Sequence, residues 1–343
     1  MPRVLVATLV AMIISIVVGP KFIEFLRRNE FGQHIREEVP EHHQAKQGTP
    51  VMGGLLIVLA AIVAFLALSH YTWAALTILF VTLSCAAIGF TDDLIKITNR
   101  RSLGLSGRWK LAWMVAITVV VGFLTHHFGL QHERAVFVPF VDQWYGLGWG
   151  WYVLLFVIIA GAANGVNLAD GVDGLAAGTG IISLFTFTAM SAVSFIRSSP
   201  GSAALRDVNK LDMAIWGAAL IGGAIGFLWF NAAPAEIFMG DTGSLALGGA
   251  LAGFAVMTKT ELLLILVGGI FVIEALSVML QVASFKYWKR RVFLMAPIHH
   301  HFEMKAWSAT KIMVRFWIVT AILAAAGFAL YYAYYLPALR AAR

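Results

Sequence analysis

Residues 74–96 of the chain read AALTILFVTLSCAAIGFTDDLIK. The part from 74 to 91 carries no charged residue and has about the length that crosses the hydrocarbon core of a bilayer as a helix. Its apolar residues follow one another without the alternation that a barrel strand needs, so the pattern favours a helix. The stretch ends with Asp92, Asp93 and Lys96. It therefore predicts a membrane-spanning helix with two acids near one membrane face.

The composition of the whole chain agrees with a membrane protein. Of its 343 residues, 60% are hydrophobic and 13% are charged, against about 45–50% and about 25% in an ordinary soluble domain. So few charged side chains cannot cover a soluble protein of this length, which excludes a soluble globular enzyme. The single cysteine, Cys85, lies in an apolar run and excludes a disulfide framework or a cysteine metal site.

Apolar blocks of similar length recur along the chain and predict about ten transmembrane helices. They lie near 4–26, 51–69, 74–91, 111–128, 150–163, 176–196, 213–231, 244–258, 262–283 and 311–336. The first is predicted to stay in the protein, because no small-residue cleavage site follows it and basic residues do. These spans leave no room for a large extramembrane domain. We therefore predict an all-α, polytopic integral membrane protein in which residues 1–343 form a single domain.

The distribution of lysine and arginine predicts which side each connection faces. The connections 27–50, 92–110 and 284–310 contain 14 of the 25 Lys and Arg residues, and cytoplasmic connections are the ones enriched in these residues. An even number of spans then places both termini on the periplasmic or extracellular side. The net charge of +7 is explained by basic loops that face anionic lipid headgroups, so it does not point to nucleic acid.

Five aspartates lie in short connections that this topology returns to the cytoplasmic face. They are Asp92 and Asp93 in GFTDDLIK, Asp170 and Asp173 in NGVNLADGVDG, and Asp241 in FMGDTGS. Taken singly, they have ordinary explanations, because adjacent acids mark solvated helix ends and Asp241 suits a helix N-cap. Neighbouring residues of a helix also point in different directions, so Asp92 and Asp93 alone could not clamp one ion.

Taken together, the five carboxylates predict a metal site. Like charges at close range raise each other's pKa, and a divalent cation removes that penalty. Oxygen ligands without cysteine favour magnesium or manganese, and magnesium commonly binds carboxylates together with substrate phosphates. The glycine-rich backbone of 240–244 can approach an anion closely at a helix start. We therefore predict an active site on the cytoplasmic face that holds magnesium and a phosphate-containing substrate.

Basic residues and histidines near the same face are candidates for phosphate contacts. Lys46, Lys96, Arg108 and Lys110 could hold diphosphate oxygens, with Lys46 first because HQAKQGTPVMGG places it in a compact turn before a span. The segment 297–303, PIHHHFE, carries three consecutive histidines, which cannot all ligate one metal from a regular helix or strand. Either it is an interfacial loop of amphipathic side chains, or one or two imidazoles bond phosphate, sugar or leaving group.

The order of these motifs resembles that of a known family. HQAKQGTPVMGG, GFTDDLIK, NLADGVDGLAAG, FLWFN, FMGDTGSLALGG and APIHHHFE are similar to the phospho-N-acetylmuramoyl-pentapeptide transferases, bacterial enzymes of the polyprenyl-phosphate N-acetylhexosamine-1-phosphate transferase superfamily (glycosyltransferase 4 family). The likeness covers nearly the whole chain, and the histidine triplet is similar to the muramoyl-pentapeptide branch. The departures are Val51 and Ala169, where threonine is usual, and Leu94, where an aromatic residue is usual. None of them removes a charged site residue.

The resemblance implies a magnesium-dependent, multi-pass enzyme of peptidoglycan biosynthesis in the bacterial plasma membrane. It implies transfer of phospho-MurNAc-pentapeptide from UDP-MurNAc-pentapeptide to undecaprenyl phosphate, which forms lipid I and releases UMP. It further implies a homodimer. Direct attack by the lipid phosphate is favoured over an aspartyl-phosphate intermediate, because a phosphate monoester is mostly dianionic at neutral pH.

The resemblance also implies roles for individual residues. Asp241 would be the principal magnesium ligand, and Asp92, closest to the attacking phosphate, is a second candidate ligand. The implied catalytic residues are Asp92, Asp93, Asp241, His300 and His301. The implied substrate-binding residues are Lys46, Lys96, Lys110, Asn167, Asp170, Asp173, Asn231, Phe238, Gly240, Ser244, Gln281 and His299. Among these, Phe238 is expected to stack on uracil.

Two other functions fit part of the pattern. One is a sister polyprenyl-phosphate N-acetylglucosamine-1-phosphate transferase of another envelope polymer pathway. The other is a transporter or channel that uses intramembrane acids, for which Glu274 inside the ninth predicted span is the one suitable residue. A transporter should carry more acids at mid-membrane depth, whereas these acids gather at one end of the spans. The enzyme is therefore favoured.

Overall fold

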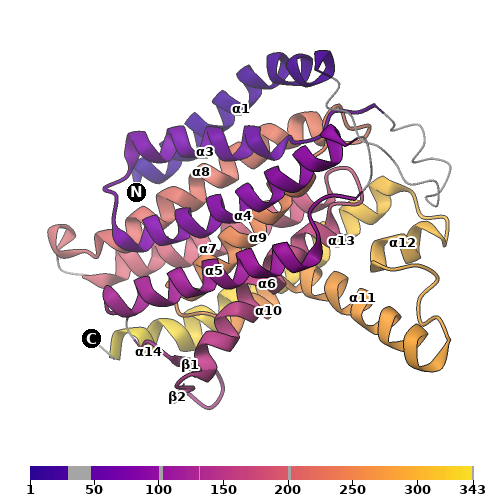
Figure 1. Ribbon diagram of the computed structural model, residues 1–343. Helices are drawn as coiled ribbons and strands as arrows, with labels where there is room; N and C mark the ends of the chain where they lie inside the picture. Colours follow the sequence, from indigo (N-terminus) through magenta and orange to yellow (C-terminus); the bar gives the residue numbers. More distant parts are fainter. Residues whose placement is uncertain (30–47, 100–102, 131, 200–201, 342–343) are drawn as a thin grey trace.

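The computed structural model describes residues 1–29, 48–99, 103–130, 132–199 and 202–341, which form a bundle of long helices (Figure 1). The elements are α1 (Pro2–Arg28), α3 (Gly54–Leu68), α4 (Trp73–Thr98), α5 (Gly107–His127), β1 (Ala135–Val138), β2 (Gln143–Gly146), α6 (Gly150–Ala169), α7 (Leu175–Ser198), η1 (Ala203–Leu205), α8 (Val208–Asn231), α9 (Gly240–Met257), α10 (Leu263–Val267), α11 (Gly269–Trp288), α12 (Ile298–Glu303), α13 (Ala309–Leu330), η2 (Tyr331–Tyr335) and α14 (Leu336–Ala341). Each predicted span overlaps a helix of this set.

Eight helical segments in the described part of the chain are long and apolar enough to cross a membrane. They are α1, α4, α5, α6, α7, α8, α11 and the continuous segment Ala309–Arg340. The helix α3 is also apolar but has only 15 residues, and α9 opens with the polar stretch 240–244. The protein is therefore a multi-pass membrane protein, as its composition predicted.

The prediction of an all-helical chain is wrong in one place. Between α5 and α6 the strands β1 and β2 pair as an antiparallel hairpin, with Val136 opposite Tyr145 and Phe137 opposite Trp144. Branched and aromatic side chains in such cross-strand pairs stabilise a hairpin. The hairpin is also held to the bundle, because the Tyr335 hydroxyl donates to the backbone oxygen of Phe137.

Several predicted helix boundaries are also wrong. The predicted span 262–283 is two helices, α10 and α11, with a break at Gly268. The helix α4 continues past 91 to Thr98, and α6 continues past 163 to Ala169. Both extensions carry polar residues that tertiary packing covers, so helical structure does not end where the apolar run ends.

The helices α8 and α9 form the centre of the bundle. In the most apolar window of α8, 83% of the residues are buried, against 22% in α1, so α8 is internal and α1 is peripheral. The helix α8 packs against α1, α3 and α7, while α9 packs against α4, α6 and α3. The fully buried rings of Trp216, Phe227 and Phe254 fill the space between these elements.

A close approach of α4 to α9 positions the acidic residues. A Cβ atom at Gly89 would lie 2.1 Å from the backbone oxygen of Asp241, so the two helices can meet there only because residue 89 has no side chain. One turn later α4 carries Asp92 and Asp93, which therefore lie beside the first turn of α9.

Figure 1 marks both ends of the chain at the left of the bundle, whereas α12 lies at its right. The Arg3 guanidinium contacts His70 in the connection before α4, 2.7 Å from Nε2. Near the other terminus, Arg340 donates to the backbone oxygen of Arg197 at the end of α7. The two ends of the described chain therefore lie at one end of the bundle, and the side of the membrane that this end faces stays a prediction.

Candidate active site

Asp92 and Asp93 lie on α4, two turns before its end, and not in a solvated connection as the sequence suggested. Asp92 is 1% exposed and Asp93 is 2% exposed. Their side chains engage different partners, as neighbouring positions on a helix require. Asp92 contacts lysines and a loop, whereas Asp93 contacts the start of α9.

Asp93 accepts hydrogen bonds from the first turn of α9. The backbone N–H of Asp241 donates to Oδ1 at 3.1 Å, and the N–H of Thr242 donates to Oδ2 at 2.9 Å. The Thr242 hydroxyl also donates to Oδ2, at 2.7 Å. Asp93 thus satisfies two amides that a helix start leaves without partners, and its negative charge suits that end of the helix.

Gly240 is required for this arrangement. Its φ is +73°, and a Cβ atom there would lie 2.6 Å from Oδ2 of Asp93. Only glycine therefore lets the chain enter α9 so close to the carboxylate. Thr242 was not predicted as a site residue; its place beside Asp241 in GDTGS was the available signal, but the sequence does not show that its hydroxyl faces α4.

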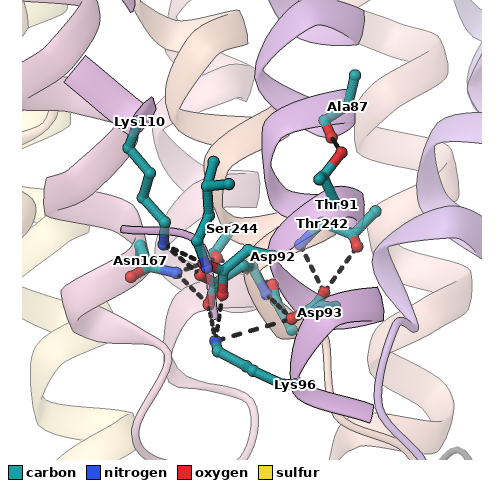
Figure 2. A network of polar contacts seen from close by, with 12 residues as sticks. Ala87, Thr91, Asp92, Asp93, Lys96, Lys110, Asn167, Thr242 and Ser244 are labelled. Atoms are coloured by element: carbon teal, nitrogen blue, oxygen red, sulfur yellow. Dashed lines mark hydrogen bonds and ion pairs between the residues drawn. The ribbon is translucent and has the colours of Figure 1, made fainter. Parts of the chain in front are cut away.

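Asp92 and Asp241 share two lysines, Lys96 and Lys110, and Figure 2 shows both lysines beside Asp92. Lys96 Nζ lies 2.6 Å from Oδ2 of Asp92 and 3.2 Å from Oδ1 of Asp241. Lys110 Nζ lies 2.9 Å from an oxygen of each of the same two carboxylates. The backbone N–H of Leu105 also donates to Asp92, at 2.7 Å. The predicted convergence of Asp92 and Asp241, 149 positions apart, is therefore confirmed.

Asn167 fixes the other side of Asp241. Its amide Nδ2 lies 2.9 Å from Oδ1 of Asp241 and 2.9 Å from Oγ of Ser244. The Ser244 hydroxyl in turn donates to the backbone oxygen of Gly240. Because Asn167 is on α6 and Ser244 is on α9, this chain of bonds ties the end of one helix to the start of the other (Figure 2).

The charges of the cluster leave an excess of acid. Asp92, Asp93 and Asp241 each offer a carboxylate oxygen within 4.8 Å of the others, and only Lys96 and Lys110 form ion pairs with them among the described residues. Asp170, directly after α6, lies close enough to feel this excess of negative charge. Burial, and then the nearby charges of Asp241 and Asp93, raise its pKa well above the ordinary value of 3.8.

This donor set fits a magnesium ion. All three groups are carboxylates, and hard oxygen donors are what magnesium prefers. Asp92 and Asp241 are the candidates to hold the ion, because their partners are mainly lysine ammonium groups, whose place a cation can take. Asp93 is instead held by two backbone N–H groups and a hydroxyl of α9.

The three histidines of α12 make three different contacts. His299 is fully buried, with Nδ1 3.0 Å from Oε1 of Glu274. His300 Nδ1 lies 2.5 Å from Oε2 of Glu303. His301 Nδ1 accepts from the backbone N–H of Leu294 at 3.1 Å. Burial, and then the charge of Lys305, lower the pKa of His301, which favours the neutral ring that this acceptor role requires.

Other predicted substrate-binding residues hold loops in place around the cluster. Asp173 accepts from the N–H of Ala235 at 3.2 Å. Asn231 is buried; it accepts from the N–H of Gly174 and donates to the oxygen of Ile237. Their bonds join the connection after α6 to the connection before α9.

Gln281 and Phe238 also make backbone contacts. The Gln281 amide bonds the backbone of 292–293, where the chain leaves α11. The backbone of Phe238 pairs with Pro50 and Gly53, and its ring is partly buried. Lys46 lies outside the described residues. The roles proposed for these residues toward substrate stay predictions.

Residues 75–259 match the family described as glycosyl transferase family 4, so the chain is a membrane-embedded transferase. The matched region contains Asp92, Asp93, Asn167 and Asp241, so it covers the whole cluster.

Relatives with nearly the full length of this chain are more specific. A phospho-N-acetylmuramoyl-pentapeptide-transferase of Frankia alni is 45% identical over 356 residues, which cover 98% of this chain and 99% of the relative. Proteins with the same name from Geobacillus thermodenitrificans and Bacillus subtilis are 44% and 42% identical, each over 94% of this chain and 96% of the relative. The chain belongs to the phospho-N-acetylmuramoyl-pentapeptide transferase family, which confirms the resemblance drawn from its motifs.

Proposed function

We propose that the protein transfers phospho-MurNAc-pentapeptide from UDP-MurNAc-pentapeptide to undecaprenyl phosphate, forming lipid I and releasing UMP for peptidoglycan synthesis. The name shared by the relatives supports the reaction. The observation that carries the proposal is the cluster in which Asp92, Asp241, Lys96 and Lys110 meet. A cluster of carboxylates and lysines suits a reaction between two phosphates.

The reaction exchanges one phosphoanhydride for another. An oxygen of the lipid phosphate attacks the sugar-linked phosphorus of the donor. The bond from this phosphorus to the bridging oxygen of the diphosphate breaks, and UMP leaves with that oxygen. Because a bond of the same kind is broken and formed, no ATP is needed. Catalysis consists mainly of placing two phosphates in line and offsetting their charge.

The residues of the cluster divide this work. Lys96 and Lys110 are partly exposed, with 32% and 22% of their side chains accessible, so their ammonium groups can reach phosphate oxygens. Asp92 orients the acceptor phosphate and takes any proton that it still carries. Asn167 holds Asp241 in place. Asp241 and Asp92 would hold magnesium, which would supply positive charge to offset that of the reacting phosphates.

Direct attack by the lipid phosphate is the proposed route. The acceptor is a phosphate monoester with a second pKa of about 6, so it is mostly dianionic at neutral pH and needs little activation. Asp93 is a poor candidate for a covalent nucleophile, because its oxygens accept three hydrogen bonds from α9. A trapped phosphoenzyme, or UMP released without acceptor lipid, would contradict this route.

The proposed location is the cytoplasmic face of the bacterial inner membrane. The acceptor is confined to the bilayer and the nucleotide donor is soluble, so the site must lie at an interface. The acidic cluster lies at one end of the spanning helices, where Lys96 and Lys110 pair with it. The basic connection 284–310 carries α12, whose His299 packs on Gly171 in the loop after α6. The homodimer implied by the resemblance is proposed as well.

The contact of Glu274 bears on the transporter alternative. The Glu274 side chain is paired with His299, a residue of the histidine motif. This contact ties Glu274 to the motif that is similar to the transferase family, which does not favour a role in an ion path. No observation favours transfer of N-acetylglucosamine phosphate.

A substrate comparison tests the proposal. Purified protein is incubated with polyprenyl phosphate and either UDP-MurNAc-pentapeptide or UDP-GlcNAc, with magnesium or with a chelator, and released UMP is measured. We expect UMP only with the muramoyl donor, the lipid and magnesium together. Release of UMP from UDP-GlcNAc but not from the muramoyl donor would refute the proposed substrate.

A further inference from the structure

A buried acid and a buried histidine form a pair beneath the histidine turn. Glu274, in the second turn of α11, and His299, in α12, are both 0% exposed, and their side chains meet at 3.0 Å. The two residues are 25 positions apart and belong to helices that pack against each other. Figure 1 shows α12 near α11 and α13 at one end of the bundle.

The surroundings of this pair are apolar. Ile270, one turn before Glu274, Ile298, next to His299, and Val172 belong to one hydrophobic cluster. Among the described residues, the second carboxylate oxygen of Glu274 and Nε2 of His299 have no hydrogen-bond partner. Such a pair is a costly way to fill a core, because well-packed apolar residues in its place are often neutral or stabilising. Stability alone therefore does not explain it.

The far side of the His299 ring contacts the loop that carries two site aspartates. A Cβ atom at Gly171 would lie 2.4 Å from Nε2 of His299, so the ring packs directly on the backbone of this residue. Gly171 lies between Asp170 and Asp173. His299 thus touches Glu274 with one nitrogen and the aspartate loop with the other.

The same ring is also next to the other two histidines of the motif. His300 and His301 follow His299 directly in the short helix α12 and turn toward Glu303 and Leu294. The centroids of the His299 and His300 rings are 4.1 Å apart, so a different orientation of His299 would disturb its contacts with both His300 and Gly171. A hydrogen bond is directional, so it fixes the orientation of an imidazole ring more tightly than apolar packing does.

We propose that Glu274 is a positioning residue for the transfer reaction. Through its bond to His299 it holds α12 against the loop 170–174, and so fixes where His300, His301 and Asp170 stand at the site. It touches no substrate itself. This positioning role rests on the proposed function only where it is tested by enzyme kinetics.

Three variants separate positioning from simple support of the fold. Glu274→Leu removes the bond and leaves His299 buried without it, so this variant alone is expected to lose stability. Glu274→Leu combined with His299→Leu replaces the pair by an apolar one and is expected to recover the parent melting temperature. Glu274→Gln keeps a bond to Nδ1 whichever partner carries the proton, because an amide can accept or donate.

The kinetic arm measures kcat, KM and melting temperature with UDP-MurNAc-pentapeptide and polyprenyl phosphate. We expect the double variant to keep the parent melting temperature but to lose about 10- to 100-fold in kcat, which is the effect of a displacement of about 1 Å near reacting groups. Glu274→Gln should stay within about threefold of the parent, since it retains the bond. Recovery of kcat together with melting temperature in the double variant, or a Glu274→Gln defect as large as that of Glu274→Leu, would overturn the proposal.

The second arm does not depend on activity. Amide hydrogen exchange of segments 170–174 and 298–303 should become faster in the double variant and stay at the parent rate in Glu274→Gln. Glu261→Gln is the matched control: Glu261 is a buried acid paired with Lys259 at 2.6 Å in the connection between α9 and α10. It should leave exchange in both segments unchanged.

The two arms distinguish the two possible failures. Unchanged exchange in the double variant would refute the positioning role even if UMP release is observed. Absence of UMP release by the parent protein, with faster exchange in the double variant, would refute the proposed function and leave the positioning role supported.

Discussion

The contact between Asp93 and Thr242 allows a test of how α4 holds the start of α9. Thr242→Val keeps the shape of the side chain but removes the hydroxyl that donates to Asp93 at 2.7 Å. A hydrogen bond to a charged group contributes about 1.5–3 kcal/mol. The two backbone bonds from Asp241 and Thr242 to the same carboxylate remain, so the loss should be partial. We therefore expect a folded protein that is less stable by about 1.5–3 kcal/mol.

The control is a threonine of α4 with a weaker bond. Thr82 is also 0% exposed, but its hydroxyl donates to the neutral backbone oxygen of Ile78 at 2.8 Å. Thr82→Val should cost only about 0.5–1.5 kcal/mol. Because Asp241 is two residues into α9, Thr242→Val should also lower kcat by about tenfold through displacement of that carboxylate, whereas Thr82→Val should not.

The assay is thermal unfolding of the purified protein together with its rate of UMP release. The melting temperature should be highest for the parent protein, lower for Thr82→Val and lowest for Thr242→Val. Equal melting temperatures for the two valine variants would mean that the bond to Asp93 carries no extra stabilisation. Parent stability and parent rate in Thr242→Val would refute the reasoning that Asp93 anchors α9.

Two further predictions concern charge. Lys110→Met removes a cation that pairs with Asp92 and Asp241, so the maximal rate of UMP release should fall about 10²- to 10³-fold. The half-maximal rate should need less magnesium, because the cluster is more acidic without this lysine; a higher magnesium requirement would contradict this. The control is Lys21→Met, at an exposed position on α1. Asp170 has a raised folded-state pKa, so its contribution to stability is present below the ordinary value of 3.8 and is lost as pH rises through the raised pKa. Melting temperature should therefore fall less with rising pH in Asp170→Asn than in the parent, and identical pH profiles would refute this assignment.

Much of the architecture follows from sequence because apolar runs of spanning length admit few structures in a bilayer. The helix α8 and the helix α4 were both predicted from such runs, and the basic connections placed the acids at one end. The boundaries were harder. The helix α4 continues past its apolar run because Asp92 and Asp93 are covered by α9 and by Leu105, and these contacts link residues far apart in the chain.

The sequence predicted which residues belong to the candidate site better than it predicted how they contact one another. Five aspartates that the topology returns to one face indicated a shared cation, and the family resemblance singled out Asp241 and Asp92 as its ligands. The structure adds that Lys96 and Lys110 lie between these two carboxylates. The sequence could not predict that Asp92 pairs with lysines while Asp93 bonds the start of α9, because these contacts depend on which face of α4 meets α9. The pairing of Glu274 with His299 was also hidden, since a single acid in an apolar span gives no sign of its partner.

The central claim is that acids from α4 and α9 form one magnesium and phosphate site, and Asp241 is its most direct probe. The measurement is magnesium-dependent UMP release by Asp241→Asn, beside Asp212→Asn, a buried acid at the other end of the bundle that accepts from Ser69, His70 and Thr72. We predict a fall of about 10³-fold or more for Asp241→Asn with the fold retained, and parent activity per folded molecule for Asp212→Asn. Parent rates with unchanged magnesium dependence in Asp241→Asn would contradict the account.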